Sequence, residues 1–484
     1  MPALTISIRE RVSVLHALLT FLRDLEHPQW CYLIGVLRKS PKKNEDMAME
    51  KEMIAGEVPV SPFSRLFSMP GLDCFNIVTI GFKNEANPSA IIEGLKNTLL
   101  NHPRFSSILE TGLGENKAKW IPTKVKVEDH VVFPEIDPTI ENPDQFLEDY
   151  TSNMVFSPID MSKPLWEMHI LNMKTSDAES LLVSRFHHSL GDGMSLMSLL
   201  LACSRKTSDL EALPTLVAPK KSKVTNVWWS LVARLWFIIR LMCNTFVEVY
   251  KFLLILCSVR DATTPLMEKP SATLSPNKFI HRVISLDDVK IVKNAMNMDL
   301  AKMMAKRSTS RWGNSIGYVM IPLWMRYEND IFEYIRRAKK IMDRKKLSLE
   351  PLFSYVLLKL TVEVFGFKGG KQALRTLAMR IFGRSTIILS NVAGPSEEIS
   401  LFDHQISYVA ASISGFPQTR LTTCCLLDKA LIVHITSYVN KVIINLGVDL
   451  DVIPDPHHLC DHMVEALKMM KSAAEEKSST DLNV

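Results

Sequence analysis

The sequence predicts an α/β fold built around two hydrophobic cores, and three observations support this prediction. A chain of 484 residues is long enough for two core-forming domains. Its 47% apolar and 23% charged residues are typical of a globular protein. From Val58 onward, segments rich in β-branched and aromatic residues alternate with segments whose apolar residues recur at helical spacing. This alternation is expected when helices pack against a β-sheet.

Strands and helices can be assigned individually in the first part of this pattern. A helix is predicted over PSAIIEGLKNTLLNHP (88–103). After the last of the predicted strands, apolar residues recur from Met194 to Leu201, which predicts a buried helix that begins near Asp192. The stretch HHSLGDG (187–193) therefore lies where a strand passes into a helix. The predicted strands are FNIVTIGFK (75–83), LWEMHILNM (165–173) and SLLVSRFHHS (180–189).

Net charge and cysteine content narrow the class of protein. The formal net charge of +5 is small for this length and does not indicate nucleic-acid binding, although it is compatible with an anionic membrane or a phosphate-bearing substrate. The 8 cysteines are scattered, with one adjacent pair at Cys424 and Cys425 and no C-x-x-C spacing. This pattern disfavours a disulfide framework and a zinc site, so we expect a reducing, cytosol-facing compartment.

Residues 1–56 are expected to form an N-terminal extension. Arg9 and Arg11 precede an apolar run, as in a signal peptide, but no small-residue cleavage site follows. The charged stretch RKSPKKNEDMAMEKE (38–52) is typical of a solvated linker. The first folded half is therefore expected over residues 57–220.

The stretch HHSLGDG combines groups that suit proton transfer. A neutral histidine, whose unperturbed pKa is about 6.5, takes a proton from a hydroxyl at cellular pH, and a nearby carboxylate can orient the ring or brace the loop. Gly191 and Gly193 permit a tight turn and a close approach of substrate. The spacing alone leaves a second interpretation open, in which Asp192 only caps the helix and His187 and His188 are ordinary loop residues.

Further motifs accompany HHSLGDG in order along the chain: SPFSRLF (61–67), PLW (164–166) and NVAGP (391–395). A fifth stretch that contributes to the same resemblance is RWGNSIGYVMIPL (311–323). Together they resemble the plant wax ester synthase/diacylglycerol acyltransferase family, in which HHSLGDG matches the H-H-x-x-x-D-G active-site motif. This family is similar to the wider CoA-dependent acyltransferases related to chloramphenicol acetyltransferase. The resemblance spans residues 57–472, and four ordered motifs make chance agreement improbable.

The resemblance implies two chloramphenicol-acetyltransferase-like halves with a cleft between them. It implies transfer of a fatty acyl group from acyl-CoA to a long-chain alcohol or diacylglycerol, without a covalent acyl-enzyme. His188 would be the general base, His187 would support it, and Asp192 would hold the loop as the third residue of the catalytic motif. Gly193 would be substrate-binding, because it leaves room for the pantetheine arm or acyl chain. No cofactor, metal or nucleic acid is implied, and acyl-CoA is a substrate.

The other motif residues suggest structural roles. For Asn391, Gly394 and Pro395, we favour a strand end closed by a turn over a role in the cleft. Trp166 is adjacent to a predicted strand and is expected in the core rather than in an acyl tunnel.

A second histidine cluster, DPHHLCDHM (455–463), offers a rival metal site. His458 and His462 at i, i+4 could share a helix face as ligands. The sequence has no H-E-x-x-H motif, and a proline-initiated amphipathic helix explains the same residues, so we expect no metal.

Residues 221–280 are expected to form an amphipathic, membrane-associating crossover. In the apolar segment 228–259, charged residues interrupt every window of about 20 residues needed to span a bilayer; they are Arg234, Arg240, Glu248 and Lys251. A polar stripe at helical spacing is formed by Arg240, Asn244, Glu248 and Lys251, opposite a broad apolar surface. An interfacial helix on the endoplasmic reticulum membrane, possible also at the cell membrane, fits this pattern. The alternative is a crossover helix packed between the halves.

The second half, expected over 281–472 with a tail at 473–484, departs from the family. Relatives continue after LDDVKIVKNAMNM (286–298) into an N-D-V element, a loop and an N-x-R-P strand, whereas here DLAK follows directly. Asn329 and Asp330 repeat the letters N-D only within a charged helix. The second half is therefore predicted to be incomplete. Two other functions stay open, an acyl-CoA transferase for a soluble alcohol or amine and a catalytically impaired lipid-binding relative.

Overall fold

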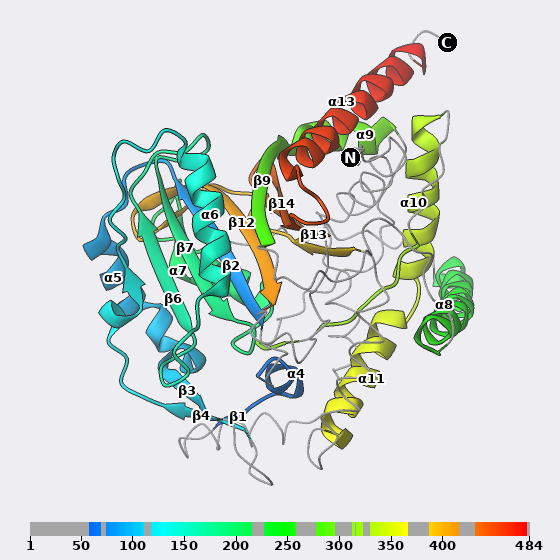
Figure 1. The fold of residues 1–484 in the computed structure, drawn as a ribbon. Coiled ribbons are helices and arrows are strands. Elements are labelled where there is room, and N and C mark those ends of the chain that lie inside the picture. Colours follow the sequence, from blue (N-terminus) through cyan, green and yellow to red (C-terminus); the bar gives the residue numbers. More distant parts are fainter. Residues whose placement is uncertain are drawn as a thin grey trace.

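The computed structural model describes residues 58–68, 74–110, 118–214, 227–257, 277–295, 312–314, 316–322, 330–365, 387–415 and 431–481. Helices and three β-sheets occupy these ranges, which confirms the α/β prediction (Figure 1). The predicted N-terminal extension and the junction at DLAK lie outside the described residues.

A seven-stranded sheet positions the HHSLGDG stretch and has the order β5-β6-β7-β2-β12-β11-β8. Its central strand β2 is buried along almost its whole length, because the sheet is covered on both faces. The strands are β2 (Cys74–Phe82), β5 (Val131–Val132), β6 (Trp166–Leu171), β7 (Ser180–His187), β8 (Ser204–Lys206), β11 (Ile399–Leu401) and β12 (His404–Gly415).

This sheet draws strands from both predicted halves. Strand β12 pairs antiparallel with β2, with Gly415 opposite Cys74 and Ile406 opposite Phe82. The two predicted sequence ranges therefore do not correspond to two separate sheets, since residues 399–415 complete the sheet of the first half.

A four-stranded sheet, in the order β10-β13-β14-β9, forms the core of the second half. Helices α9 (Leu286–Ala295) and α13 (Pro456–Asp481) bury their apolar residues against it. Helix α13 begins at Pro456, as predicted, and continues through most of the expected tail. The strands are β9 (Asn277–Ser285), β10 (Ile388–Val392), β13 (Leu431–Tyr438) and β14 (Lys441–Asp449).

The remaining elements surround the two larger sheets (Figure 1). Helices α5 and α7 follow strands of the first half, and both begin after a side-chain N-cap. They are α4 (Pro62–Leu66), α5 (Pro88–Asn97), α6 (Pro143–Phe156), α7 (Gly193–Cys203), α8 (Val227–Cys257), α10 (Ile331–Lys346) and α11 (Glu350–Phe365), with the small sheet of β1 (Val58–Pro59), β3 (Ser107–Glu110) and β4 (Lys119–Pro122).

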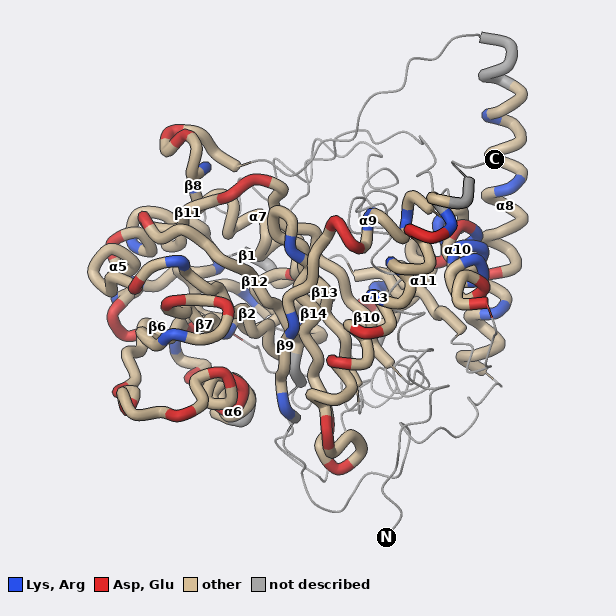
Figure 2. The backbone as a smooth tube through the Cα atoms, turned by 90° about the horizontal axis from the view of Figure 1, so that it is seen from above, with Lys and Arg blue, Asp and Glu red and all other residues tan. Residues whose placement is uncertain are grey.

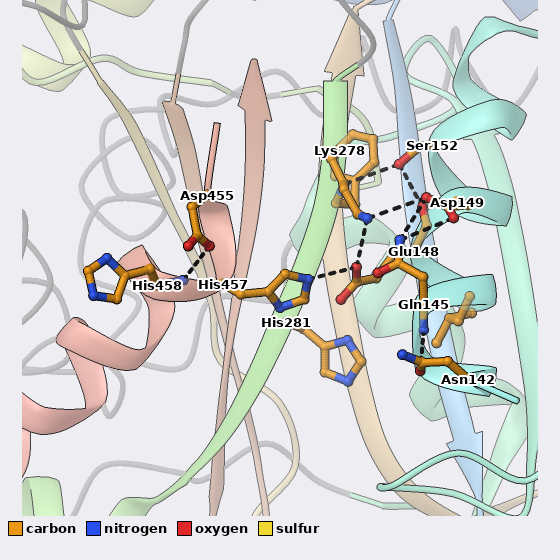
Figure 3. A network of polar contacts seen from close by, with 12 residues as sticks. Asn142, Gln145, Glu148, Asp149, Ser152, Lys278, His281, Asp455, His457 and His458 are labelled. Atoms are coloured by element: carbon orange, nitrogen blue, oxygen red, sulfur yellow. Dashed lines mark hydrogen bonds and ion pairs between the residues drawn. The ribbon is translucent and has the colours of Figure 1, made fainter. Parts of the chain in front are cut away.

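A polar network joins α6 of the first half to the second half (Figure 3). Lys278 Nζ of β9 lies 3.2 Å from a carboxylate oxygen of Glu148, and His457 Nε2 of α13 lies 3.1 Å from the same oxygen. The Phe279 amide donates to Ser152 Oγ at 3.2 Å. These contacts join α6 of the first half to β9 and α13 of the second half, so they fix how the two halves meet beside α6.

Helix α8 lies against α10 and α11 through the predicted polar stripe. Glu248 is fully buried and forms ion pairs with Arg344 and Lys345 of α10. The Leu349 amide donates to Thr245 Oγ at 2.9 Å. Asn244 and Glu248 of the stripe therefore face the protein, Arg240 and Lys251 are exposed at its edge, and the apolar face on the other side of α8 is left exposed.

One expectation for the second half needs correction, and one detail of α8 bears on which of its residues are exposed. Asp330 does not lie within the charged helix but is its N-cap, since its side chain accepts the Phe332 amide at 2.8 Å. Phe237 and Leu241 follow the periodicity of α8 but are half buried, so they do not belong to its exposed face.

Candidate active site

The two adjacent histidines are delivered by the end of β7, whose residues are all buried. The His187 amide donates to the Leu165 carbonyl at 3.0 Å, and the His188 amide donates to the Cys74 carbonyl at 2.8 Å. The PLW stretch and the start of β2 therefore hold the two histidines from either side. Trp166 of PLW is buried and donates its indole N–H to the Phe105 carbonyl at 2.9 Å, so it belongs to the core as expected.

Asp192 begins α7. Its side chain accepts the Ser195 amide at 2.9 Å, and its own amide donates to the Gly313 carbonyl at 3.2 Å. These bonds tie the loop after the histidines both to α7 and to the second half. These contacts suit the bracing role expected for Asp192.

Two further residues support the turn between His188 and Asp192. The guanidinium of Arg104 donates to the Leu190 carbonyl at 3.0 Å, and the Trp312 indole donates to the same oxygen at 2.8 Å. Burial lowers the pKa of Arg104 to about 10, which leaves it charged at cellular pH, and the negative charge of Asp192 acts in the opposite direction. The turn is thus held by two side-chain donors that share the Leu190 carbonyl oxygen.

His187 is buried beside His188. Its Nδ1 lies 2.7 Å from Ser189 Oγ, and its ring meets Phe75 edge-on at a centroid distance of 5.2 Å. His187 does not line the cavity described below. Its position suits the supporting role expected for it.

His188 is 3% exposed, and its ring lies over Phe67 of the SPFSRLF stretch at a centroid distance of 4.2 Å. Burial lowers the pKa of His188 to about 4, so the imidazole is neutral at cellular pH. A neutral imidazole has one nitrogen that carries a proton and one that accepts a proton.

Asn314 decides which nitrogen of His188 carries the proton. Its amide nitrogen donates to the His188 carbonyl at 2.7 Å and to Ser64 Oγ at 3.0 Å, so its Oδ1 must be the atom that faces His188 Nδ1 at 3.1 Å. Because an amide oxygen only accepts, Nδ1 carries the proton. His188 Nε2 is then the basic nitrogen.

An apolar cavity of about 300 Å³ extends from His188 into the first half. Its floor is one face of the seven-stranded sheet, formed by alternate residues of β2, β7 and β12. Side chains of α5, α7 and the second half enclose the rest. The lining residues include Val78, Ile80, Leu95, Leu99, Leu182, Phe186, Leu196, Leu199, Phe402 and Val409.

Of the other predicted residues, Gly193 and Asn391 line this cavity. Gly193 lines it, and a Cβ there would lie 2.9 Å from Val392 Cγ2, so the glycine lets α7 approach β10 closely. Asn391 also lines the cavity, and its Oδ1 has no hydrogen-bond partner among the described residues. At Gly394 a Cβ would meet the Ser437 carbonyl at 2.0 Å, which supports the structural role expected for this glycine.

Sequence reasoning missed several groups at the site. Asn314 and Phe67 lie in stretches that were noted as motifs, but nothing in their spacing indicates contact with His188. His434 of β13 also lines the cavity, and burial lowers its pKa to about 3. Its Nε2 accepts the Ile413 amide at 3.1 Å, so a second neutral imidazole lies in the same cavity.

The second histidine cluster has a different environment. Within the described ranges there is no group of three or more His, Cys, Asp or Glu side chains that could hold a metal ion. His458 and His462 stack edge-on at a centroid distance of 4.0 Å, and His457 pairs with Glu148. These histidines are surface and interface residues of α13.

Comparisons with known proteins agree with this architecture. The wax ester synthase/diacylglycerol acyltransferase catalytic domain matches residues 83–304, and the WS/DGAT C-terminal domain matches residues 312–471. Wax ester synthase/diacylglycerol acyltransferase 2 of Arabidopsis thaliana is 59% identical over 487 aligned positions, which include 89% of this chain and 98% of the relative. Wax ester synthase/diacylglycerol acyltransferase 3 of the same plant is 48% identical, over 92% of this chain and 99% of its own length.

Solved structures show the same fold at low sequence identity. A wax ester synthase/diacylglycerol acyltransferase from Marinobacter aquaeolei VT8 has a TM-score of 0.51 at 16% identity and covers 86% of this chain and 100% of its own. A trichothecene 15-O-acetyltransferase from Fusarium sporotrichioides also has a TM-score of 0.51, at 11% identity, over 86% of this chain and 95% of its own. The predicted architecture of two lobes is confirmed.

Proposed function

Because the chain belongs to the wax ester synthase/diacylglycerol acyltransferase family and is an acyl-CoA-dependent O-acyltransferase, we propose that His188 is its general base. The observation that supports this assignment most directly is the Asn314 contact, which leaves His188 Nε2 basic at the edge of an apolar cavity. A base held neutral by burial is ready to accept a proton from a hydroxyl.

The reaction follows from this geometry. His188 Nε2 takes the hydroxyl proton while the oxygen attacks the thioester carbonyl carbon, and a tetrahedral intermediate forms. The carbon–sulfur bond then breaks, and the imidazolium returns its proton to the CoA thiolate. The products are an ester and free CoA, and no acyl-enzyme is formed.

The apolar cavity supplies the place for the fatty acyl chain. Most of its lining residues are aliphatic or aromatic, and it runs from His188 between the sheet and helices α5 and α7. Burying methylene groups there is favourable by about 0.8 kcal/mol each. We assign Gly193 to this site because it lies at the cavity wall beside the start of α7.

We also propose that the acceptor is a lipid, either a long-chain alcohol or diacylglycerol, taken from a membrane surface. The support is the exposed face of α8, where Trp236 is 65% exposed and Phe246 is 76% exposed. An apolar face of this length is typical of a helix that lies in the bilayer interface. No helix within the described part of the chain has the length and apolar character needed to cross a bilayer.

For the location of this surface, we propose the cytosolic side of the endoplasmic reticulum membrane. The basis is the scattered cysteines, which suit a reducing compartment, and the lipid acceptor. The same exposed face of α8 favours a lipid acceptor over a soluble alcohol or amine, which would require no apolar docking surface.

A direct assay tests the function. Purified protein is given radiolabelled palmitoyl-CoA with either hexadecanol or dioleoylglycerol in mixed micelles, and products are separated by chromatography. Wax ester or triacylglycerol is the expected product. Acylation only of water-soluble alcohols or amines would contradict the lipid assignment, and no transfer to any acceptor would indicate a catalytically impaired relative.

We further propose that an element of the second half is missing between Met298 and Asp299. In support, the alignment with the first relative has 487 positions but includes only 89% of this chain of 484 residues. Some of its positions are therefore occupied by the relative alone, as expected if the relative has residues that this chain lacks. Inserting the corresponding segment of that relative should raise neutral-lipid formation in a triacylglycerol-deficient host. Equal product from both forms would show that the segment is dispensable.

A further inference from the structure

A second cavity, of about 410 Å³, lies between helices of the second half and is strongly basic. We call it the basic pocket, and none of its lining residues lines the cavity at His188. Five of its lining side chains are basic and one is acidic. The lining residues are Arg240 of α8, Ala295 of α9, Arg336, Lys339, Lys340 and Asp343 of α10, and Lys477 of α13.

Part of this charge is balanced within α10. Arg336 forms ion pairs of 2.7 Å with both Asp330 and Glu333. Lys339 also interacts with other groups of the protein, and Arg240, Lys340 and Lys477 still outnumber the single acidic residue of the lining, Asp343. The basic pocket therefore retains a surplus of positive charge, which favours an anionic ligand.

The position of the basic pocket identifies the kind of anion. Arg240 lies one helical turn from Trp236, whose side chain is on the exposed apolar face of α8. Figure 2 shows that Lys and Arg residues gather where α8 and α10 lie side by side. When an amphipathic helix lies in a membrane, its flanks are level with the lipid headgroups. The pocket is thus at the flank of the face that we assign to the membrane.

We propose that the basic pocket binds the phosphate of an anionic glycerophospholipid while the apolar face of α8 lies among the acyl chains of the same leaflet. This inference rests on the membrane docking proposed above. Arginine and lysine bind phosphate oxygens through charge-assisted hydrogen bonds, and a pocket formed by several helices presents them together. The phosphates of CoA have related chemistry, but the pocket shares no residue with the cavity that holds His188.

Vesicle binding by the full chain tests the inference. Cosedimentation is measured with phosphatidylcholine vesicles and with vesicles that contain phosphatidylserine as well. We expect tighter binding to the second kind. The double variant Lys339→Gln/Lys340→Gln should lose roughly thirtyfold in the partition coefficient on phosphatidylserine vesicles, about fivefold for each lysine, and little on phosphatidylcholine alone.

A matched control separates the basic pocket from net charge. Lys126→Gln/Lys174→Gln removes the same charge from exposed sites on the first half, where the side chains are 70% and 73% exposed. Losses of equal size in the two double variants would overturn the inference. Unchanged acyl transfer in detergent micelles shows that the pocket variant is folded.

Other outcomes distinguish this inference from the docking on which it rests. Trp236→Asp/Phe246→Asp should abolish binding to both kinds of vesicle, because it removes the apolar contact. Equal binding of the unaltered protein to both vesicles would overturn the headgroup pocket alone, and binding to neither would overturn both proposals. The double variant Lys339→Gln/Lys340→Gln could instead bind vesicles as the unaltered protein does and show a raised KM for acyl-CoA in micelles. That result would overturn the headgroup assignment and assign the pocket to CoA.

Discussion

Two pairs of adjacent histidines, His187–His188 and His457–His458, occupy opposite environments in this protein. The first pair is at a strand end, where His187 is 1% and His188 is 3% exposed. The second pair is in the first turn of α13, where the His457 side chain is 37% exposed. The same dipeptide is therefore buried at a strand end in one place and partly exposed at a helix start in the other.

The neighbours of each pair fix opposite tautomers. At His188 an amide oxygen accepts from Nδ1, so Nε2 is basic. At His457 the guanidinium of Arg282 donates to Nδ1 at 3.2 Å, so Nε2 carries the proton and faces Glu148. Of the two rings, His188 has Nε2 as its basic nitrogen, as the proposed general base requires, and the difference arises from side chains distant in sequence.

The largest expected effect separates the two pairs directly. His188→Ala should lower acyl transfer about 10² to 10⁴-fold, the range for loss of a general base, whereas His458→Ala should leave it unchanged. Initial rates with labelled acyl-CoA measure both, and circular dichroism checks folding. His187→Ala should have a smaller effect than His188→Ala. If His188→Ala transferred acyl groups at the wild-type rate, His188 would not be the general base.

Asn314 is the next test, because it acts through His188. Asn314→Ala should lower kcat about 10 to 10²-fold, since the ring loses the partner that fixes its tautomer. In Asn314→Asp a carboxylate would stabilise the imidazolium, so the acidic limb of the pH–rate profile should move to higher pH. Ser64→Ala, which removes only one contact of Asn314, is the milder control. An unchanged pH profile in Asn314→Asp would argue for a merely structural role.

Stability against pH distinguishes buried from exposed histidines. Burial holds the pKa of His188 near 4 and that of His434 near 3, below the ordinary value of 6.5. Unfolding therefore takes up protons at these sites below about pH 6.5. The free energy of unfolding should fall by a few kcal/mol between pH 6.5 and pH 4.

Chemical denaturation at several pH values measures this slope. His434→Asn should reduce the slope, because it removes one buried titrating group, whereas replacing exposed His458 by Asn should not. A slope that is unaffected by His434→Asn would show that this histidine is not held neutral.

The smallest effect concerns the helix caps beside each pair. Asp192 caps α7, and Asp455 caps α13 by accepting the His458 amide at 3.0 Å. Replacing either residue by Ala should cost about 1 kcal/mol of stability. Only Asp192→Ala should also lower acyl transfer, because Asp192 braces the loop that carries His188. Equal rates in the two variants would show that this loop needs no brace.

Much of the local structure could be predicted from sequence. Strands β2, β6 and β7 and the start of α7 at Asp192 agree with the predicted pattern, since the periods of strands and helices are properties of neighbouring residues. The same holds for α13, whose proline start is local. The prediction that Asp330 lies inside the charged helix is wrong, because a polar residue in a charged stretch fits the interior of a helix and its N-cap equally well.

The sequence by itself determined the α/β class, the junction that carries His188, and an amphipathic helix around Glu248, because each depends on short-range periodicity and recognisable motifs. Only the tertiary structure decided that Asn314 faces His188 and that Glu248 of the polar stripe of α8 packs inward against Arg344. It also decided that β12 completes the first sheet. These contacts join residues about one hundred or more positions apart, and hydrogen bonds between such residues depend on how the whole chain packs rather than on any local spacing.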